Sequence, residues 1–251
     1  MSNLYTLGLV SVSFRGHTPE EILAEMKACG LSVIEWGSDV HAPADQQETL
    51  QKIVKLQAQY GITCSSYGTY FRLGVTPIGE LEAYIAAAKL LGTDVLRLWC
   101  GAKSGADMTG EECETLLAVC REAAVIAARH RVTLCMECHR KTFTEQVKDA
   151  LWLMAAVDSP HFKMYWQPFQ WQTVAENVEN AKAIAPHALH VHVFNWHGND
   201  KLPLGEALAD WRAYLQHFST PRTLLLEFMP NDTLGELKTE TAALKNIIGE
   251  L

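Results

Sequence analysis

Short runs rich in Val, Ile, Leu and Phe alternate along the chain with longer segments in which apolar residues recur at helical spacing. The first such run, residues 6–13, is followed by a helix that begins at Thr18 and ends near Gly30. Thr18 stands at the N-cap, Pro19 at the first helical position, and Glu21 completes a capping box. Because this alternation repeats, the sequence predicts parallel strands joined by crossover helices.

The repeat gives eight strand–helix units. The predicted strands cover residues 6–13, 32–36, 62–66, 95–99, 132–137, 162–167, 189–194 and 223–228. The predicted helices cover about 18–30, 45–60, 76–92, 110–130, 143–157, 173–185, 206–218 and 233–248. Barrels built from eight such units run to about 250 residues. The chain of 251 residues is therefore predicted to be an α/β protein, a single (β/α)8 TIM barrel domain over residues 1–251.

Successive residues of a strand face opposite sides of a sheet, so each predicted strand indicates what it turns toward the barrel interior. In the last strand, Glu227 shares its inward face with Leu225, whereas Leu226 and Phe228 are expected to face the helices. Six strands place a polar residue inward near the C-terminal end, where such barrels carry their chemistry. These residues are Glu35, Arg97, Glu137, Gln167, His192 and Glu227.

A purely structural interpretation of these polar groups is the alternative. The whole set could merely solvate an open barrel mouth, although Glu and His are metal-ligand types. Glu35 and Arg97 could pair as an ion bridge in the barrel wall. His190, one step deeper than His192 on the seventh strand, fits a hydrogen-bonded core histidine better than a ligand.

The charge balance and the cysteines indicate which kinds of partner and which cell compartment to expect. Acidic residues outnumber basic ones, 29 to 21, for a formal net charge of −8, which argues against a nucleic-acid partner. The first residues have no basic region typical of a signal peptide, and no apolar run approaches a membrane span. The seven cysteines are scattered through apolar segments. We therefore expect reduced thiols and a cytoplasmic location.

One cysteine cluster matches the attachment motif of c-type haem. It is the C-x-x-C-H run from Cys135 to His139. Because this run continues a predicted strand, Cys135 and Cys138 are expected to face opposite sides of it. Two sulfurs so placed cannot serve one ligand, which disfavours both a haem and a redox site.

Five motifs stand in order on the predicted strands. They are Gly30-x4-Glu35-Trp36-Gly37-x2-Val40-His41-x-Pro43, Leu96-Arg97-Leu98-Trp99-x-Gly101, Glu137-x-His139, His190-x-His192 and Leu226-Glu227. On these motifs essentially the whole chain resembles the xylose isomerase-like TIM barrel family. That family includes sugar phosphate isomerases and epimerases and the family-2 apurinic endonucleases.

The resemblance implies a divalent ion, Mn²⁺ before Mg²⁺, Co²⁺ or Zn²⁺, held by Glu, Asp, His and Glu from strands five to eight. On this chain the corresponding residues are Glu137, Gln167, His192 and Glu227. Gln167 departs from the family's Asp: its amide oxygen can ligate but brings no charge, so we expect weak metal binding. The His that the family places three residues later is also absent, because Gln170 stands there.

The function expected from these residues is a metal-dependent isomerase or epimerase acting on a ketose or related polyol. Two carboxylates, Glu137 and Glu227, can remove and return a proton next to a carbonyl, and a divalent ion stabilises the resulting enediolate. The predicted loop 67–74 carries aromatic rings and a guanidinium suited to a sugar, with surface packing as the alternative. The residues expected to contact substrate are His41, Tyr70, Arg72, Arg97, Trp99, His139 and His197.

Three other functions remain to be compared with this one. A dehydratase acting on an inosose-like ketone would use the same chemistry at the carbon next to the carbonyl. A sugar-binding barrel with a degenerate metal centre would explain Gln167. A DNA-repair endonuclease would need more His and Asp ligands than this chain shows, and its charge opposes DNA. The partner is thus expected to be a small sugar or polyol; the identity of that sugar, any phosphate on it, and whether the chain forms a homo-oligomer are left open.

Overall fold

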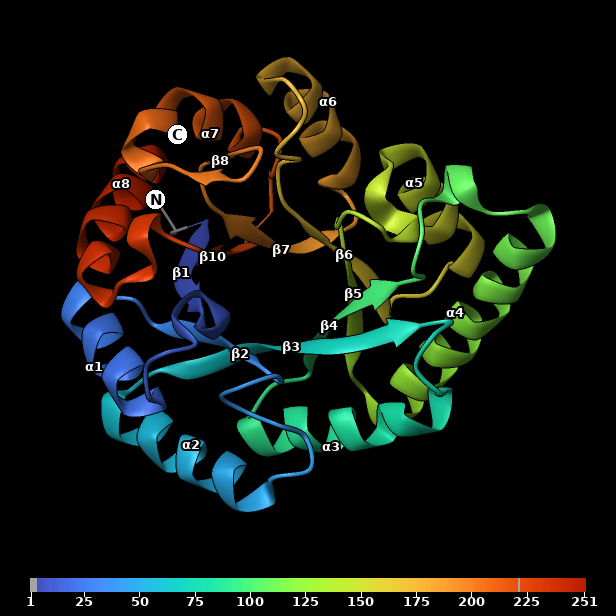
Figure 1. Cartoon of the computed structure of the whole chain (residues 1–251), viewed down its shortest axis with the longest axis horizontal. Coiled ribbons are helices and arrows are strands. Elements are labelled where there is room, and N and C mark those ends of the chain that lie inside the picture. Colours follow the sequence, from blue (N-terminus) through green and yellow to red (C-terminus); the bar gives the residue numbers. More distant parts are fainter. Residues whose placement is uncertain (1–3, 221) are drawn as a thin grey trace.

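The strands of the main sheet are short apolar runs that pair in parallel with their neighbours in the chain. In the computed structural model, which describes residues 4–220 and 222–251, eight of them close into a barrel in the order β1-β10-β7-β6-β5-β4-β3-β2 (Figure 1). Their bounds are β1 Tyr5–Val10, β2 Val33–Gly37, β3 Thr63–Leu73, β4 Val95–Cys100, β5 Thr133–Glu137, β6 Phe162–Trp166, β7 Ala188–Val193 and β10 Arg222–Leu226. A small antiparallel hairpin, β8 Trp196–His197 with β9 Asp200–Lys201, follows β7. The predicted (β/α)8 barrel is confirmed.

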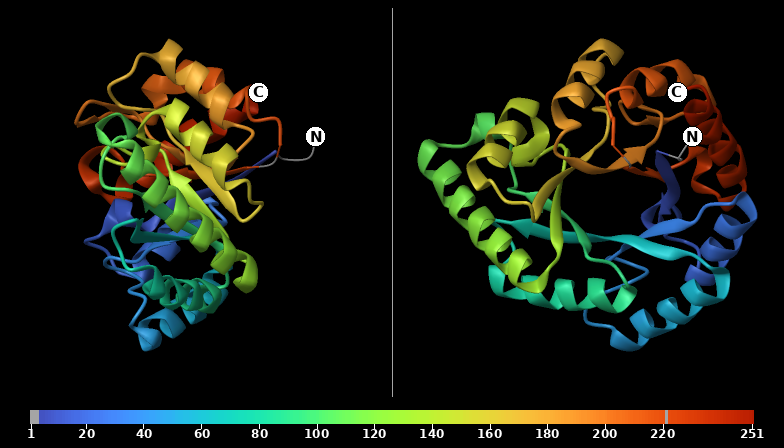
Figure 2. Two further views of the ribbon diagram at one scale, coloured as in Figure 1. Left: turned by 90° about the vertical axis from the view of Figure 1, so that its right-hand side faces the viewer. Right: turned by 180° about the vertical axis from the view of Figure 1, so that it is seen from behind.

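Helices surround the barrel, as both ends of the molecule show (Figures 1 and 2). Within the described residues they are α1 Pro19–Cys29, α2 Gln47–Tyr60, α3 Leu81–Leu91, α4 Gly110–His130, α5 Val147–Val157, α6 Val174–Ile184, α7 Leu208–Leu215 and α8 Leu237–Gly249. The predicted capping box between Thr18 and Glu21 is present at the start of α1. Thr109 and Thr173 cap α4 and α6 in the same way. None of the helices in this part of the chain is long and apolar enough to cross a membrane.

Two apolar layers form the core. The larger layer lies between the barrel and the helices, where Trp166 of β6 packs in ring contact with Trp211, Tyr214 and Phe218 around α7. The smaller layer fills the barrel interior and includes Leu225 of β10. Above it, toward the C-terminal ends of the strands, the interior becomes polar. This change of side-chain type positions the site described below.

Two strands end more than two residues away from the predicted position. The third strand does not end at residue 66; β3 continues through the predicted loop 67–74 as far as Leu73, after a register shift relative to β4 beyond Gly68. Tyr67 and Phe71 stabilise this extension by packing on Tyr84 of α3, with ring centroids 6.4 and 5.6 Å away. The first strand is shorter than predicted, because residues Ser11–Phe14 form a 3-10 helix.

The last strand ends with a change of backbone direction that the alternation did not predict. Phe228 has a φ of +50°, in the left-handed region that side chains other than glycine rarely adopt. The alternation predicted that Phe228, like Leu226, would face the helices. Instead, Phe228 lines the cavity at the barrel mouth. Its backbone N–H is held there by the hydroxyl of Ser13, at 2.9 Å.

Glu240 of α8 provides a test of the packing between α8 and the barrel. Its carboxylate is buried and accepts the backbone N–H of Leu204 at 3.0 Å. Burial raises its pKa from 4.5 to about 7. Because the folded pKa lies above the unfolded one, ionisation destabilises the fold: the free energy of unfolding falls as pH rises from about 4.5 to 7, and the penalty stays above that.

We therefore consider Glu240→Gln, which keeps an oxygen for Leu204 but cannot ionise. We expect the free energy of unfolding of this variant, minus that of the wild type, to be larger at pH 8 than at pH 5. The expected change in the difference is about 1–3 kcal/mol. Urea denaturation of both proteins at the two pH values measures it, with Glu122→Gln on the exposed side of α4 as the control. A difference that is the same at both pH values would contradict the prediction.

Candidate metal centre and active-site cavity

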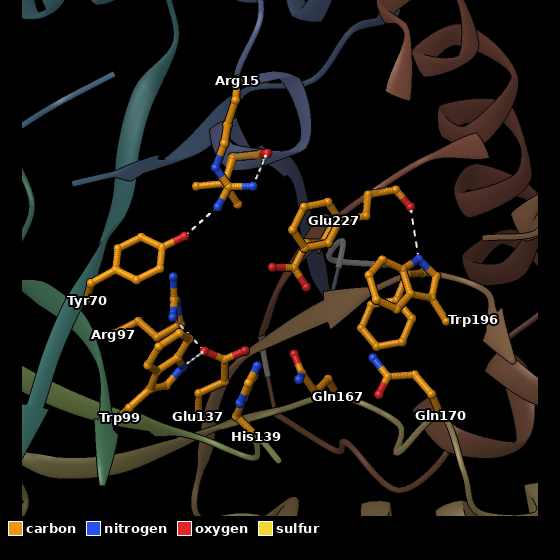
Figure 3. A pocket seen from close by; sticks show the side chains of 13 residues that line it. Arg15, Tyr70, Arg97, Trp99, Glu137, His139, Gln167, Gln170, Trp196 and Glu227 are labelled. Atoms are coloured by element: carbon orange, nitrogen blue, oxygen red, sulfur yellow. Dashed lines mark hydrogen bonds and ion pairs between the residues drawn. The ribbon is translucent and has the colours of Figure 1, made fainter. Parts of the chain in front are cut away.

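A cavity of about 300 Å³ opens at the C-terminal ends of the barrel strands (Figure 3). Side chains from strands on all sides of the barrel, or from the loops that follow them, line it, which is the usual place for chemistry in this fold. The lining consists of Val12, Arg15, Tyr70, Arg97, Trp99, Glu137, His139, Gln167, Gln170, Phe194, Trp196, Glu227 and Phe228.

Three ligand-type side chains converge at the bottom of the cavity. One ligand atom each from Glu137, His192 and Glu227 lies within 4.8 Å of the other two, and all three residues are buried. The Nδ1 atom of His192 is 3.4 Å from Glu227 Oε2 and 3.9 Å from Glu137 Oε1. Parallel strands bring these residues together because Glu137 ends β5, His192 lies near the end of β7, and Glu227 directly follows β10.

Gln167 completes this group with an oxygen. Its Nε2 donates to the carbonyl oxygen of Cys138 at 3.0 Å, which turns its Oε1 toward His192 Nδ1, also at 3.0 Å. In Figure 3 the amide of Gln167 and the carboxylates of Glu137 and Glu227 point toward one shared space. Two carboxylates, an imidazole nitrogen and an amide oxygen are a donor set that fits a divalent cation.

A buried arginine fixes one of these carboxylates. Arg97 of β4 donates from Nη1 to Glu137 Oε2 at 2.5 Å and from Nε to Glu35 Oε1 at 2.9 Å, so the predicted bridge between Glu35 and Arg97 is confirmed. Trp99 Nε1 donates to the same oxygen of Glu137 at 2.5 Å. Gly68 leaves the room for this arrangement, since a Cβ there would lie 2.5 Å from Glu35 Oε1. Glu137 is thus held by Oε2, and its Oε1 faces the cavity centre.

Glu35 also faces the imidazole of His192 from below. Its Oε2 accepts the hydroxyl of Ser66 at 2.9 Å and lies 3.6 Å from His192 Nε2. The two nitrogens of His192 therefore face different groups, Nε2 toward Glu35 and Nδ1 toward the cavity. His190 behaves as the predicted core histidine, with Nε2 at 3.3 Å from the carbonyl oxygen of Ser65.

Burial and neighbouring charges act in opposite directions on the ionisable groups. Burial alone would raise the pKa of Glu137, but the Arg97 guanidinium lowers it below its usual value. For Glu227, burial dominates and raises the pKa to about 7. Burial opposes the charge on His192, yet the carboxylates of Glu227 and Glu35 raise its pKa to about 8. Since metal ligands must be deprotonated, protons compete with a cation for these groups near neutral pH.

An aromatic wall borders the cavity beside Glu137. The Tyr70 ring meets Trp99 edge-on with centroids 5.3 Å apart, and His139 lies against the other side of Trp99 at 4.7 Å. The His139 Nδ1 atom is 2.7 Å from the carbonyl oxygen of Arg140, which can only accept, so Nδ1 carries a proton that it donates. Four of the residues expected to contact substrate, including Arg97, therefore lie together in the cavity.

The other three expected contact residues lie outside it. His41 is buried with both ring nitrogens engaged, by Ser11 Oγ and the carbonyl oxygen of His17, each at 3.1 Å. Arg72 stacks on Trp99 from outside the lining, with its guanidinium carbon 4.5 Å from the ring centroid. His197 is exposed on the β8–β9 hairpin and lines a separate, adjoining pocket.

Several lining residues were not found from the sequence. Arg15 follows the 3-10 helix after β1, a position that the overlong predicted strand disguised. Its guanidinium bonds to the hydroxyl of Tyr70 and to Asp39. Phe228 lines the cavity because of the change in backbone direction described above. Trp196 belongs to the hairpin after β7, and no apolar periodicity in the sequence predicts this hairpin. The only signal for Arg15 is its position after a strand end.

The cysteine cluster is structural. Cys135 lies in the core layer inside the barrel, and Cys138 lies in the layer between barrel and helices. The two thiols thus face opposite sides, as predicted, and all seven cysteines are free.

The sequence profile of the xylose isomerase-like TIM barrel matches residues 23–242. The chain belongs to this family. It is 23% identical over 190 residues to a 3-dehydroshikimate dehydratase of Bacillus anthracis, covering 67% of this chain and 68% of that protein.

Solved structures show the same fold at low sequence identity. The probable 3-DHS dehydratase AsbF of Bacillus anthracis superposes with a TM-score of 0.83 and 20% identity, over 96% of this chain and 98% of that one. An L-ribulose 3-epimerase gives 0.75 and 14%, over 97% and 94% of the two chains. The IOLI protein, whose crystal structure contains a zinc atom, gives 0.78 and 15%, over 98% of each. Solved structures with this fold thus include a protein with a bound zinc atom, an epimerase and a probable dehydratase.

Replacing Gln167 tests whether its oxygen belongs to a metal centre. We expect Gln167→Asp to bind Mn²⁺ about tenfold more tightly than the wild type, because hard divalent cations favour anionic oxygen. The shorter Asp loses the bond to Cys138, which limits the gain. Calorimetric titration of Mn²⁺ measures the change, and Gln170→Asp, which adds the same charge elsewhere in the cavity, is the matched control. If neither the wild type nor Gln167→Asp binds Mn²⁺, the interpretation of these residues as a metal centre is wrong.

Proposed function

We propose that the chain is a divalent-metal-dependent isomerase or epimerase that moves a proton next to the carbonyl of a ketose or related polyol. The observation that carries the proposal is the convergence of Glu137, His192 and Glu227 within 4.8 Å of one another at the C-terminal mouth of the barrel. The amide oxygen of Gln167 is the proposed fourth ligand. Mn²⁺ is the cation we expect, and the cytoplasm the location.

In this proposal the two carboxylates exchange the proton with substrate. Glu137 is anchored through Oε2 by Arg97 and Trp99, so Oε1 is the oxygen that can reach a substrate carbon. Glu227 approaches the same space from β10 and is the partner that returns the proton (Figure 3). Proton removal leaves an enediolate with negative charge on oxygen, and a bound divalent ion supplies the Lewis acid that stabilises such charge.

The aromatic wall is the proposed surface for the carbon face of the substrate. Tyr70 and Trp99 present apolar ring area, and His139 and Arg97 add polar contacts for hydroxyl groups. Cavities of this kind orient a small ligand by a few polar groups within apolar walls, and the volume of about 300 Å³ suits a monosaccharide or cyclitol.

One observation favours a dehydratase as the second candidate. His139 lines the cavity next to Glu137 (Figure 3), and because its Nδ1 donates to a backbone carbonyl, Nε2 is the ring nitrogen that remains for taking up or giving a proton. Elimination of water needs a base for the carbon-bound proton and an acid for the departing hydroxyl, and this third group could share those tasks. The sequence similarity to a 3-dehydroshikimate dehydratase points the same way.

Proton NMR in D2O separates the candidates. The Mn²⁺-loaded protein would be incubated with ketoses, inososes and 3-dehydroshikimate. An isomerase or epimerase incorporates deuterium at the carbon next to the carbonyl and yields a product of the same mass apart from the label. A dehydratase yields a product that has lost water. A sugar-binding barrel with a degenerate centre binds ligand but gives neither product, and such a result would reject both enzyme proposals.

Glu227→Gln removes a candidate base and one negative charge at the centre. We expect turnover of the substrate found above to fall by at least about a hundredfold, in the range for loss of a general base. At pH 8 the variant should resist urea at least as well as the wild type does, because the buried carboxyl group of Glu227, whose ionisation destabilises the fold at that pH, has been removed. Glu122→Gln on α4 serves as the control. Full activity in Glu227→Gln would exclude it as the base.

A further inference from the structure

A second cavity of about 330 Å³ adjoins the first at the barrel mouth. The two share four lining residues: His139, Gln167, Gln170 and Trp196. Figure 3 shows Gln170 beside Trp196 at this edge of the metal-centre cavity. A ligand whose reacting end lies between Glu137 and Glu227 can therefore extend past Gln170 into the second cavity.

The second cavity is lined by cations without acids. Arg140 and Lys141 contribute to its wall, and none of its lining residues is Asp or Glu, in a chain whose net charge is −8. The guanidinium of Arg140 lies on the Trp171 ring, with its central carbon 3.9 Å from the ring centroid. One carboxylate contacts this wall through the backbone: Glu145 accepts the N–H of Lys141 at 2.8 Å.

These two cations differ from Arg97 and Arg15, the cations that line the first cavity, because they lack a charged partner. Arg97 pairs with two buried carboxylates, and Arg15 Nε lies 2.6 Å from Asp39. Within the described residues, the side chains of Arg140 and Lys141 make neither a hydrogen bond nor an ion pair. Stacking on Trp171 holds the plane of the Arg140 guanidinium but leaves all its N–H groups available at the edges.

We propose that this second cavity binds an anionic group, a carboxylate or a phosphate, carried by the substrate that reacts at the metal centre. A guanidinium fork and a neighbouring ammonium are the side chains that bind such groups with charge-assisted hydrogen bonds. The amides of Gln170 and Asn199 line the same space and add neutral donors. The assignment rests on the proposed function, because the shared wall makes the bound anion part of a substrate.

The test uses small anions that report on the second cavity alone. Inorganic phosphate and acetate are titrated calorimetrically into the full-length protein without added metal, so that neither anion binds through a cation. The variant Arg140→Gln/Lys141→Gln removes both cations. The variant Lys89→Gln/Arg129→Gln removes the same charge from the last turns of α3 and α4, at the opposite end of the barrel, and is the matched control.

We expect the wild type and the control to bind at least one anion, and the cavity variant to bind it about tenfold or more weakly. Tighter binding of phosphate would indicate a phosphorylated substrate, and tighter binding of acetate a carboxylated one. No saturable binding by the wild type, unchanged binding by the cavity variant, or an equal loss in the control overturns the proposal.

A parallel titration with Mn²⁺ separates this proposal from the proposed function. The cavity variant should bind Mn²⁺ as the wild type does, since neither substituted residue belongs to the metal centre. If no protein binds Mn²⁺ while only the cavity variant loses the anion, the proposed function fails and the anion site stands. If Mn²⁺ binds everywhere and the anion nowhere, the anion site fails alone.

Discussion

The guanidinium of Arg97, enclosed between the carboxylates of Glu35 and Glu137, is the interaction on which the rest of this site depends. It joins three strands, β2, β4 and β5, inside the barrel, where all three side chains are buried. Removing one member of a buried ion pair leaves an uncompensated charge and typically costs about 3–5 kcal/mol. The buried Arg97 therefore fixes the carboxylate of Glu137 through one oxygen and leaves the other oxygen available for chemistry.

The same group of charges reaches the histidine of the centre. Glu35 faces Nε2 of His192, while Nδ1 of that ring faces Gln167 and Glu227. A carboxylate behind a metal-binding histidine typically orients the ring and selects its tautomer. The barrel interior can be polar at this level because each charged side chain has a partner of opposite charge or a hydrogen-bond partner. Gly68 is required beside this group, because any side chain there would meet Glu35.

The sequence predicted the barrel and brought the right strand ends together, because two simple regularities govern them. Parallel strands end on one side of the sheet, and side chains alternate, so Glu137, His192 and Glu227 had to meet if the barrel closed. Where backbone geometry breaks the alternation, prediction failed: the positive φ of Phe228 reverses its direction.

Tertiary packing accounts for other differences. Residues 67–73 continue as a strand because Tyr67 and Phe71 find a partner on α3, which no local pattern reveals. His41 was expected to contact substrate from its motif, but Ser11 and the carbonyl of His17 engage both ring nitrogens. Which of several polar residues near a strand end points into the cavity depends on such contacts rather than on spacing.

The neutral Gln167 is consistent with catalysis once the charges at the centre are considered together. Under the proposed function, Glu137 and Glu227 balance a divalent ion, and the carboxylate that takes the proton becomes neutral as the negatively charged enediolate forms, so the total charge of the centre stays the same. A third carboxylate ligand would make the centre negative before the reaction begins, and would weaken the pull of the ion on substrate oxygens. In this proposal the glutamine trades metal affinity for a stronger Lewis acid, and a substrate held in the second cavity by its own anionic group compensates for the weaker metal binding.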